Sequence, residues 1–198
     1  MRRTAALLKP AAPSRKALPP LLFFTDPVRT PDPAAVARTL PAGSAVVFRA
    51  FGGPDAEAQA VKLLAIARQR RLRLLIGADW GLARRVGAHG VHLPERLAHR
   101  AGAMKTGQPH WTVTAAAHSL RAARAALAAG ADAAVVSVAF ASNSPSAGRP
   151  LGPVRLARLV RAAGGPVYAL GGINNETARR LKDAGLVGLA AVEGLAGA

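Results

Sequence analysis

The chain has 198 residues, and 51% of them are hydrophobic, which is enough for one well-buried core. It contains no cysteine, which excludes disulfides, thiolate catalysis and cysteine-ligated metals. The formal net charge of +17 suits an anionic partner, such as a phosphorylated metabolite, nucleic acid or an acidic membrane, but it does not indicate a fold.

The first 20 residues carry five cations, no acid and four prolines. They lack the continuous apolar core of a secretory signal, and no later apolar run approaches the ~18 residues of a membrane span. We therefore expect residues 1–20 to be a basic, flexible N-terminal tail, with an organellar presequence as the alternative. The expected protein is cytoplasmic and makes no membrane contact.

From residue 21 onward, short apolar runs alternate with longer stretches rich in alanine and arginine. Most runs are apolar throughout, which is typical of parallel strands covered by helices. Eight β/α units in one chain predict a single domain over 21–198, an α/β protein with the (β/α)₈ TIM-barrel fold rather than an open doubly wound sheet. The predicted strands are 21–26, 45–49, 72–77, 90–94, 111–116, 133–138, 167–170 and 188–192.

Three stretches between these runs predict amphipathic helices, at 55–71, 119–132 and 151–165. Only six residues follow the eighth strand, so we expect the last helix to be short or absent. Such an end would leave an apolar flank of the barrel uncovered, and we expect the N-terminal segment or a second copy, in a homodimer, to cover it. The predicted apolar face of the first helix contains Val61, Leu64, Ala65 and Arg68.

Two glycines, Gly171 and Gly172, end the seventh strand and lead into a helix that Asn174 or Asn175 can cap, with Glu176 in its first turn. A bare-backbone turn before a helix N-terminus is suited to holding phosphate, although a tight βα turn alone would give the same pattern. Because phosphate commonly lies after strands 7 and 8 of such barrels, the position favours the phosphate interpretation.

Neighbouring loops supply further candidates for a phosphate site. Ser142 and Ser144 follow the sixth strand and offer two hydroxyls, although a polar loop of small turn residues is an equal explanation. Val192 and Glu193 end the eighth strand beside the glycine turn. Glu193 counts against tight binding, because an anion beside phosphate weakens binding unless it turns away or pairs with an arginine.

Basic groups at other strand ends are candidates for the chemistry. His118 follows the fifth strand, where it could act as acid or base, or simply cap the helix that begins at Ser119. His92 alternates with apolar residues, which favours a packed, hydrogen-bonded histidine. Arg49 ends the second strand and could meet an anionic substrate or remain solvated.

Carboxylates and surface charge give weaker signals. Asp26, Asp79 and Glu95 end the first, third and fourth strands, where they could hold Mg²⁺, but no motif pairs them. The basic run 68–73 complements a helix C-terminus. Aromatic residues are only 4% of the chain and fall mostly within strands, which argues against nucleic-acid binding despite the charge.

Taken together, three segments resemble the thiamine phosphate synthase superfamily: 74–95, 115–140 and 166–195. The resemblance implies a (β/α)₈ barrel that joins an aminopyrimidine diphosphate to a thiazole phosphate and releases pyrophosphate with Mg²⁺. The related thiazole tautomerases share the barrel and isomerise a thiazole carboxylate phosphate without a metal.

Part of the family pattern is present. The phosphate-binding Gly-Gly-Ile after the seventh strand is intact and ends at Ile173. Ser142 and Ser144 match the Thr-x-Thr of the sixth loop, and Arg49 matches the arginine of the second strand. His118 stands where the tautomerases transfer a proton.

The remaining pattern differs. Lysine positions of the family hold Phe51 and Pro145, and the aspartate positions expected to bind metal hold Ala78 and, approximately, Leu97. Glu193 replaces the serine whose backbone amide meets phosphate. The resemblance therefore implies a partly preserved thiazole-phosphate half and a depleted pyrophosphate-metal half, with Mg²⁺ the implied cofactor but its usual ligands missing.

Four functions follow as hypotheses. The first is a transferase of thiamine biosynthesis close to thiamine phosphate synthase, with weak synthase activity. The second is a tautomerase-like isomerase that uses His118, and the third is a non-catalytic barrel that binds a phosphorylated small molecule or a partner protein. The fourth, a nucleic-acid binder, rests on charge alone.

Overall fold

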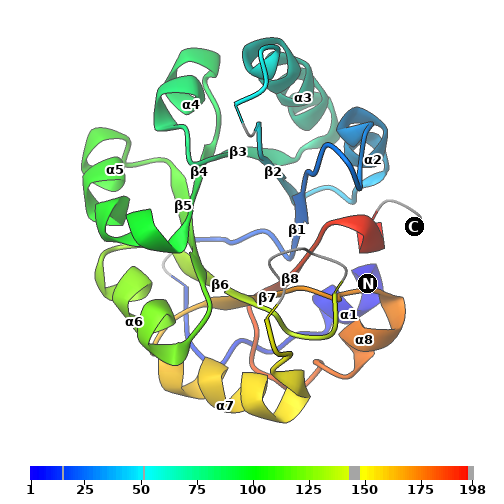
Figure 1. The fold of residues 1–198 in the computed structure, drawn as a ribbon, viewed down its shortest axis with the longest axis vertical. Coiled ribbons are helices and arrows are strands. Elements are labelled where there is room, and N and C mark those ends of the chain that lie inside the picture. Colours follow the sequence, from blue (N-terminus) through cyan, green and yellow to red (C-terminus); the bar gives the residue numbers. More distant parts are fainter. Residues whose placement is uncertain (15, 51, 143–147, 196–198) are drawn as a thin grey trace.

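The fold is a closed barrel of eight parallel strands surrounded by helices (Figure 1). The computed structural model describes residues 1–14, 16–50, 52–142 and 148–195. Each strand pairs with the next along the chain, and β1 pairs with β8, so the predicted TIM barrel is confirmed. The strands are β1 (Leu21–Phe24), β2 (Ala45–Phe48), β3 (Arg73–Gly77), β4 (Gly90–Leu93), β5 (Thr112–Ala117), β6 (Ala133–Ser137), β7 (Val167–Leu170) and β8 (Gly188–Ala191).

Helices follow the strands around the outside of the barrel (Figure 1). Several begin at a side chain that accepts a backbone N–H of the first turn, as a helix N-cap should; Asp32, Asp79 and Ser119 are examples. The described helices are α1 (Arg2–Ala6), α2 (Pro33–Thr39), α3 (Ala56–Arg70), α4 (Trp80–Val86), η1 (Glu95–Arg100), α5 (Ala101–Gly107), α6 (Leu120–Ala128), α7 (Gly152–Ala163), α8 (Asn175–Arg179) and η2 (Glu193–Leu195).

The strands bury both of their faces. Alternate residues such as Leu22 and Phe24 belong to the cluster that fills the barrel, while Leu21 and Phe23 belong to the larger cluster between strands and helices. Burial on both faces explains why the strand sequences are apolar throughout rather than alternating. Tyr168 is fully buried in the barrel, and its hydroxyl donates a 2.7 Å hydrogen bond to the Pro19 carbonyl.

The predicted apolar face of α3 is wrong by about one residue. Val61 is 53% exposed and Ala65 is exposed, whereas Ala60 and Ala67 are fully buried. The predicted stripe ended at Arg68, whose burial would remove a charge from water. Rotating the helix by one position buries an entirely apolar stripe instead: Ala60, Leu63, Leu64, Ile66 and Ala67.

The N-terminal residues lie against the barrel. The Met1 amino group is hydrogen bonded to Asn175 of α8, and Ala11 N–H donates to the Gly185 carbonyl at 2.8 Å. Lys16 Nζ donates to two carbonyls before β5, at 2.9 and 2.7 Å. In the described residues β8 is followed only by the short turn η2, so the predicted short closing element is confirmed and α1 lies beside it (Figure 1).

These contacts are consistent with the expectation that the N-terminal segment covers the open flank. The flexibility predicted for residues 1–20 and the predicted homodimer both stay predictions. Across the described ranges, none of the helices is long and apolar enough to cross a membrane.

Candidate functional site

Two adjoining cavities open at the carboxyl ends of the strands, where the loops carry the predicted site residues. The β7–β8 cavity has a volume of about 560 Å³, and the central cavity about 400 Å³. Both are lined by Arg29, Ser142, Leu170, Gly171 and Val192, so a ligand can extend from one into the other.

The glycine pair after β7 is required by its surroundings. Gly171 and Gly172 have φ angles of +96° and +62°, in the left-handed region that disfavours other residues. A Cβ on Gly171 would overlap the Val138 side chain, and one on Gly172 would lie 2.8 Å from Phe140 Cβ and overlap the Ala141 carbonyl. The loops after β6 and β7 therefore meet at a distance that only bare backbone permits.

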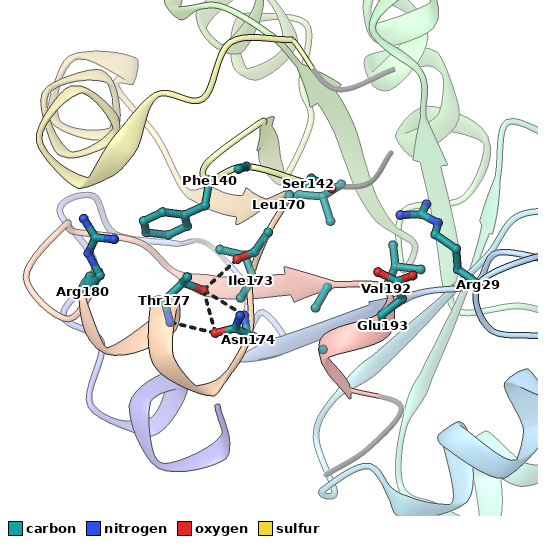
Figure 2. A pocket seen from close by; sticks show the side chains of 15 residues that line it. Arg29, Phe140, Ser142, Leu170, Ile173, Asn174, Thr177, Arg180, Val192 and Glu193 are labelled. Carbon is teal, nitrogen blue, oxygen red and sulfur yellow. Dashed lines mark hydrogen bonds between the residues drawn. The ribbon is translucent and has the colours of Figure 1, made fainter. Parts of the chain in front are cut away.

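Some backbone N–H groups around this turn are hydrogen bonded within the protein, and others are not. Asn174 is the N-cap of α8, and its Oδ1 accepts the N–H groups of Glu176 and Thr177, both at 2.9 Å (Figure 2). Within the described residues, the N–H groups of Gly172 and Ile173 make no hydrogen bond. The donors available to an anion therefore include those of the loop, whereas Asn174 occupies two of the N–H groups in the first turn of α8.

Other predicted phosphate residues surround the same cavity. Ser142, Val192 and Glu193 line it, whereas Ser144 lies outside the described residues. Glu193 is exposed at the start of η2, on the Arg29 side of the cavity (Figure 2). Its carboxylate remains an unfavourable neighbour for a phosphate in the β7–β8 cavity.

Two arginines meet a carboxylate at the mouth of the central cavity. Asp26 Oδ2 accepts from Arg29 Nη2 at 2.8 Å and from Arg49 Nη2 at 3.3 Å. The hydrogen bond from the Arg29 side chain, partly opposed by burial, lowers the pKa of Asp26 to about 2. Burial lowers the pKa of Arg49, and the charge of Asp26 opposes that change. Arg49 Nε also donates to the Thr25 carbonyl at 2.7 Å, which fixes the guanidinium.

His118 is paired with Glu95, which begins η1. Glu95 Oε2 accepts the backbone N–H of His118 at 2.8 Å and lies 2.7 Å from its ring Nδ1. Burial raises the pKa of Glu95, but the hydrogen bonds from the His118 side chain and backbone outweigh it, so the pKa is lowered. The helix-capping role is performed by Ser119, whose hydroxyl accepts Ala122 N–H at 3.1 Å.

His92 lies beneath the central cavity as a packed residue. Its Nδ1 is 3.0 Å from the Thr114 hydroxyl, and its ring meets the Phe24 ring edge-on with centroids 4.8 Å apart. Burial, with a smaller effect from the charge of Arg49, lowers its pKa to about 3. The imidazole is therefore neutral at physiological pH, as the prediction of a packed, hydrogen-bonded histidine requires.

The residues on the β3 and β4 side do not form a metal site. Ala78 and Leu97 offer no side-chain oxygen, and Asp79 caps α4 by accepting a backbone N–H at 2.8 Å. Glu95 is engaged by His118. No three His, Asp or Glu side chains come together anywhere in the described part of the chain. This arrangement does not fit Mg²⁺, and we derive no step through a metal.

A third cavity, the β2–β3 cavity of about 890 Å³, adjoins this side of the barrel. It contains Gly77, Asp79 and Trp80 in its lining. Of the described residues that line it, Arg49 is the one permanent cation.

Sequence reasoning missed three contributions to the site. Arg29 reaches both cavities, because a turn held by Asp26 folds it back over the barrel mouth. The Asp26–Arg29 spacing of three residues was the available signal. Thr177 donates to the Gly172 carbonyl at 2.8 Å, and Arg180 lies over the Phe140 ring with 5.2 Å between its Cζ and the centroid (Figure 2).

Comparisons with known proteins agree with this geometry. A family model described as thiamine monophosphate synthase (TMP-TENI) matches residues 21–195. The thiamine-phosphate synthase of Thiobacillus denitrificans is 37% identical over 159 residues, which are 77% of this chain and 74% of the relative. The putative thiamine-phosphate synthase 2 of Aquifex aeolicus is 33% identical over 133 residues, which are 67% and 71%.

A solved structure gives the same result. The thiamine phosphate pyrophosphorylase from Pyrococcus furiosus superposes with a TM-score of 0.77 at 25% identity, covering 91% of this chain and 88% of that one. The eight-stranded barrel and the glycine turn after β7 thus occur in a chain that belongs to the thiamine monophosphate synthase family of thiamine biosynthesis.

Proposed function

We propose that this protein binds a phosphorylated thiazole, with the phosphate in the β7–β8 cavity and the ring in the central cavity. The observation that carries the proposal is the turn at Gly171 and Gly172, which leaves the N–H groups of Gly172 and Ile173 available beside Ser142. Backbone N–H groups at a bare turn suit phosphate, and Arg29 adds a positive charge at the edge.

We further propose that condensation with release of pyrophosphate is slow in this protein. A departing pyrophosphate develops negative charge that metal ions and lysines would stabilise. The family's lysine positions hold Phe51 and Pro145, and Ala78 and Leu97 stand where the resemblance places metal-binding aspartates. Removal of one such contact typically lowers a rate by about 10²–10³.

A second candidate function is proton transfer by His118 on the bound thiazole, as the resemblance to tautomerases suggests. The 2.7 Å contact between Glu95 and the His118 ring favours it, because a carboxylate stabilises the imidazolium that a general base forms. The chemistry requires only a substrate proton within reach of the imidazole.

Calorimetric titration with thiazole phosphate tests the binding proposal. We expect saturable binding by the wild-type protein and none with the unphosphorylated thiazole alcohol, because the proposed contacts are made to phosphate. Heat from both ligands, or from neither, would contradict the placement. Titration with an oligonucleotide is the comparison that separates this function from a charge-driven nucleic-acid binder, for which ionic strength should abolish binding.

A further inference from the structure

A single oxygen of Glu95 holds His118 at two points. Oε2 accepts the backbone N–H at 2.8 Å and lies 2.7 Å from ring Nδ1. A carboxylate is acceptor-only, so a short contact with Nδ1 requires a proton on Nδ1. The bond to the adjacent backbone N–H keeps this oxygen in place even when the ring rotates.

We propose that Glu95 is a positioning residue that fixes neutral His118 in the Nδ1–H tautomer and leaves the Nε2 lone pair for the ligand. Within the described residues Nε2 makes no hydrogen bond, and His118 lines the central cavity. In water neutral imidazole prefers the opposite, Nε2–H, tautomer, which would place a donor rather than a base at that nitrogen.

A purely structural explanation accounts poorly for this pair. The side chains of His118 and Glu95 are 60% and 43% exposed, and ion pairs of that kind contribute little to stability. The helix that follows is already capped by Ser119. The pair therefore contributes more to the direction and proton position of the ring than to folding.

The inference rests on the proposed function for the identity of the ligand. A thiazole phosphate that reaches from the β7–β8 cavity into the central cavity lies beside His118, because both cavities share Gly171 and Ser142. Nε2 would take a proton from a ring-attached carbon and return it to another position. The imidazolium formed between the two steps retains its Nδ1 proton and faces the negative charge of Glu95.

Charged groups around the pair support the ionised form of Glu95. Arg121 of α6 acts on Glu95, and three further arginines line the cavity that His118 faces: Arg29, Arg49 and Arg149. His92 lines the same cavity but is buried and neutral at physiological pH. No carboxylate lines the central cavity in the described part of the chain.

Nitrogen NMR of the full chain, labelled with ¹⁵N-histidine, measures the tautomer directly. Spectra recorded at about pH 8.5 have imidazoles of ordinary pKa in the neutral form. The signal of His118 is identified by its loss in His118→Gln. We expect its Nδ1 to resonate as a protonated nitrogen and its Nε2 as an unprotonated one, and the reverse pattern would overturn the inference even without any variant.

Three variants test whether Glu95 is the cause of the His118 tautomer. Glu95→Ala should shift His118 toward the Nε2–H tautomer, while Glu95→Gln, whose Oε1 accepts from the same two N–H groups, should keep Nδ1 protonated. Glu57→Ala removes an exposed glutamate paired with Arg85 elsewhere and should change nothing at His118. An unchanged tautomer in folded Glu95→Ala would overturn the role of Glu95. A failure of thiazole-phosphate binding alone would leave the tautomer result intact and contradict only the proposed function.

Discussion

The two sides of the barrel mouth differ in what they use to meet a ligand. On the β7–β8 side, the N–H groups of Gly172 and Ile173 make no hydrogen bond within the described residues, and close packing of the glycine turn on the loop after β6 fixes their positions. On the side of β2, β3 and β4, the candidate ligand-binding groups are the side chains of Arg49, Asp79 and Glu95, and each already has a hydrogen-bond partner.

Under the proposed function, this difference would account for a family fold that persists while its pyrophosphate chemistry weakens. A backbone site is maintained by packing, because any substitution that disturbs it also disturbs neighbouring loops. A side-chain site loses its ligands by single substitutions that leave the barrel intact. We therefore expect phosphate binding to survive better than metal-assisted chemistry, and four substitutions test that contrast.

The largest effect is expected from Gly172→Ala in the turn after β7, which lines the β7–β8 cavity. The new Cβ would meet the Phe140 and Ala141 backbone at φ +62°, so the loop must move and its N–H groups with it. Thiazole-phosphate affinity should fall by about 100-fold, or ~3 kcal/mol, in a calorimetric titration.

The matched control is Gly164→Ala after α7. Gly164 has φ +80° but no atom within 4 Å of an added Cβ, so it carries the same backbone penalty of about 1–2 kcal/mol without a collision. The stability of the Gly164→Ala variant should fall, while its affinity for thiazole phosphate stays at the wild-type value. Equal losses of affinity in both variants would mean that the glycine turn has no special relation to the ligand.

Asp26→Asn sharpens the contrast by removing the carboxylate that holds both arginines. The folded pKa of about 2 lies below the ordinary 3.8, so the charged form stabilises the protein above about pH 4, and that contribution is lost as the pH falls toward 2. At pH 7 the variant should lose about 2 kcal/mol of unfolding free energy in urea.

Asp32→Asn is the control for that change. Asp32 caps α2 by accepting Ala35 N–H, and asparagine caps a helix equally well. Its unfolding free energy should be nearly unchanged at pH 7. A loss as large as that of Asp26→Asn would assign the effect to the general loss of a negative charge.

His92 in β4 gives a second pH dependence of stability, which arises from a buried base rather than from a carboxylate. Burial keeps His92 neutral in the folded protein to about pH 3, whereas the unfolded chain takes up the proton near pH 6.5. Stability should therefore decrease as the pH falls below 6.5, by about 2 kcal/mol at pH 5. Urea unfolding at pH 7 and pH 5 should show that this decrease is smaller in His92→Gln; an identical decrease would assign it to other groups.

The smallest effect is expected from Glu193→Ser at the edge of the β7–β8 cavity. Removing a negative charge from the edge of the β7–β8 cavity should tighten thiazole-phosphate binding about fivefold, or ~1 kcal/mol, since the side chain is exposed and screened. Glu57→Ser, a charge removal remote from the site, should leave the affinity unchanged. Weaker binding by folded Glu193→Ser would contradict the placement of the phosphate.

The strands could be predicted because their pattern is local. Continuous apolar runs gave eight strands to within one or two residues at either end, and the glycine pair with its asparagine cap followed from the same local rules. Val61 of α3 was misplaced because neighbouring stripes on that helix are similarly apolar, and packing against the barrel decides between them.

The site could be predicted only in part, because its pairs form across the sequence. Glu95 and His118 are 23 residues apart, as are Asp26 and Arg49, and no local pattern indicates that their atoms meet. Covering of the open flank by the N-terminal segment was one of two expectations, but its individual contacts with α8 and with the carbonyls before β5 were not predicted, since a basic, proline-rich segment resembles a disordered one. The two pairs of site residues are brought together by the order of the strands in the barrel.

The most direct test of the central claim is an assay of pyrophosphate release with purified protein, Mg²⁺ and both thiamine precursors. If the β2–β4 side has lost the groups that stabilise the leaving pyrophosphate, thiamine phosphate should form at a rate near background although thiazole phosphate still binds. Turnover at an ordinary enzymatic rate, about 1–10³ per second, would contradict the account. Asp79 and Glu95 would then be the first residues to substitute in search of the metal ligands.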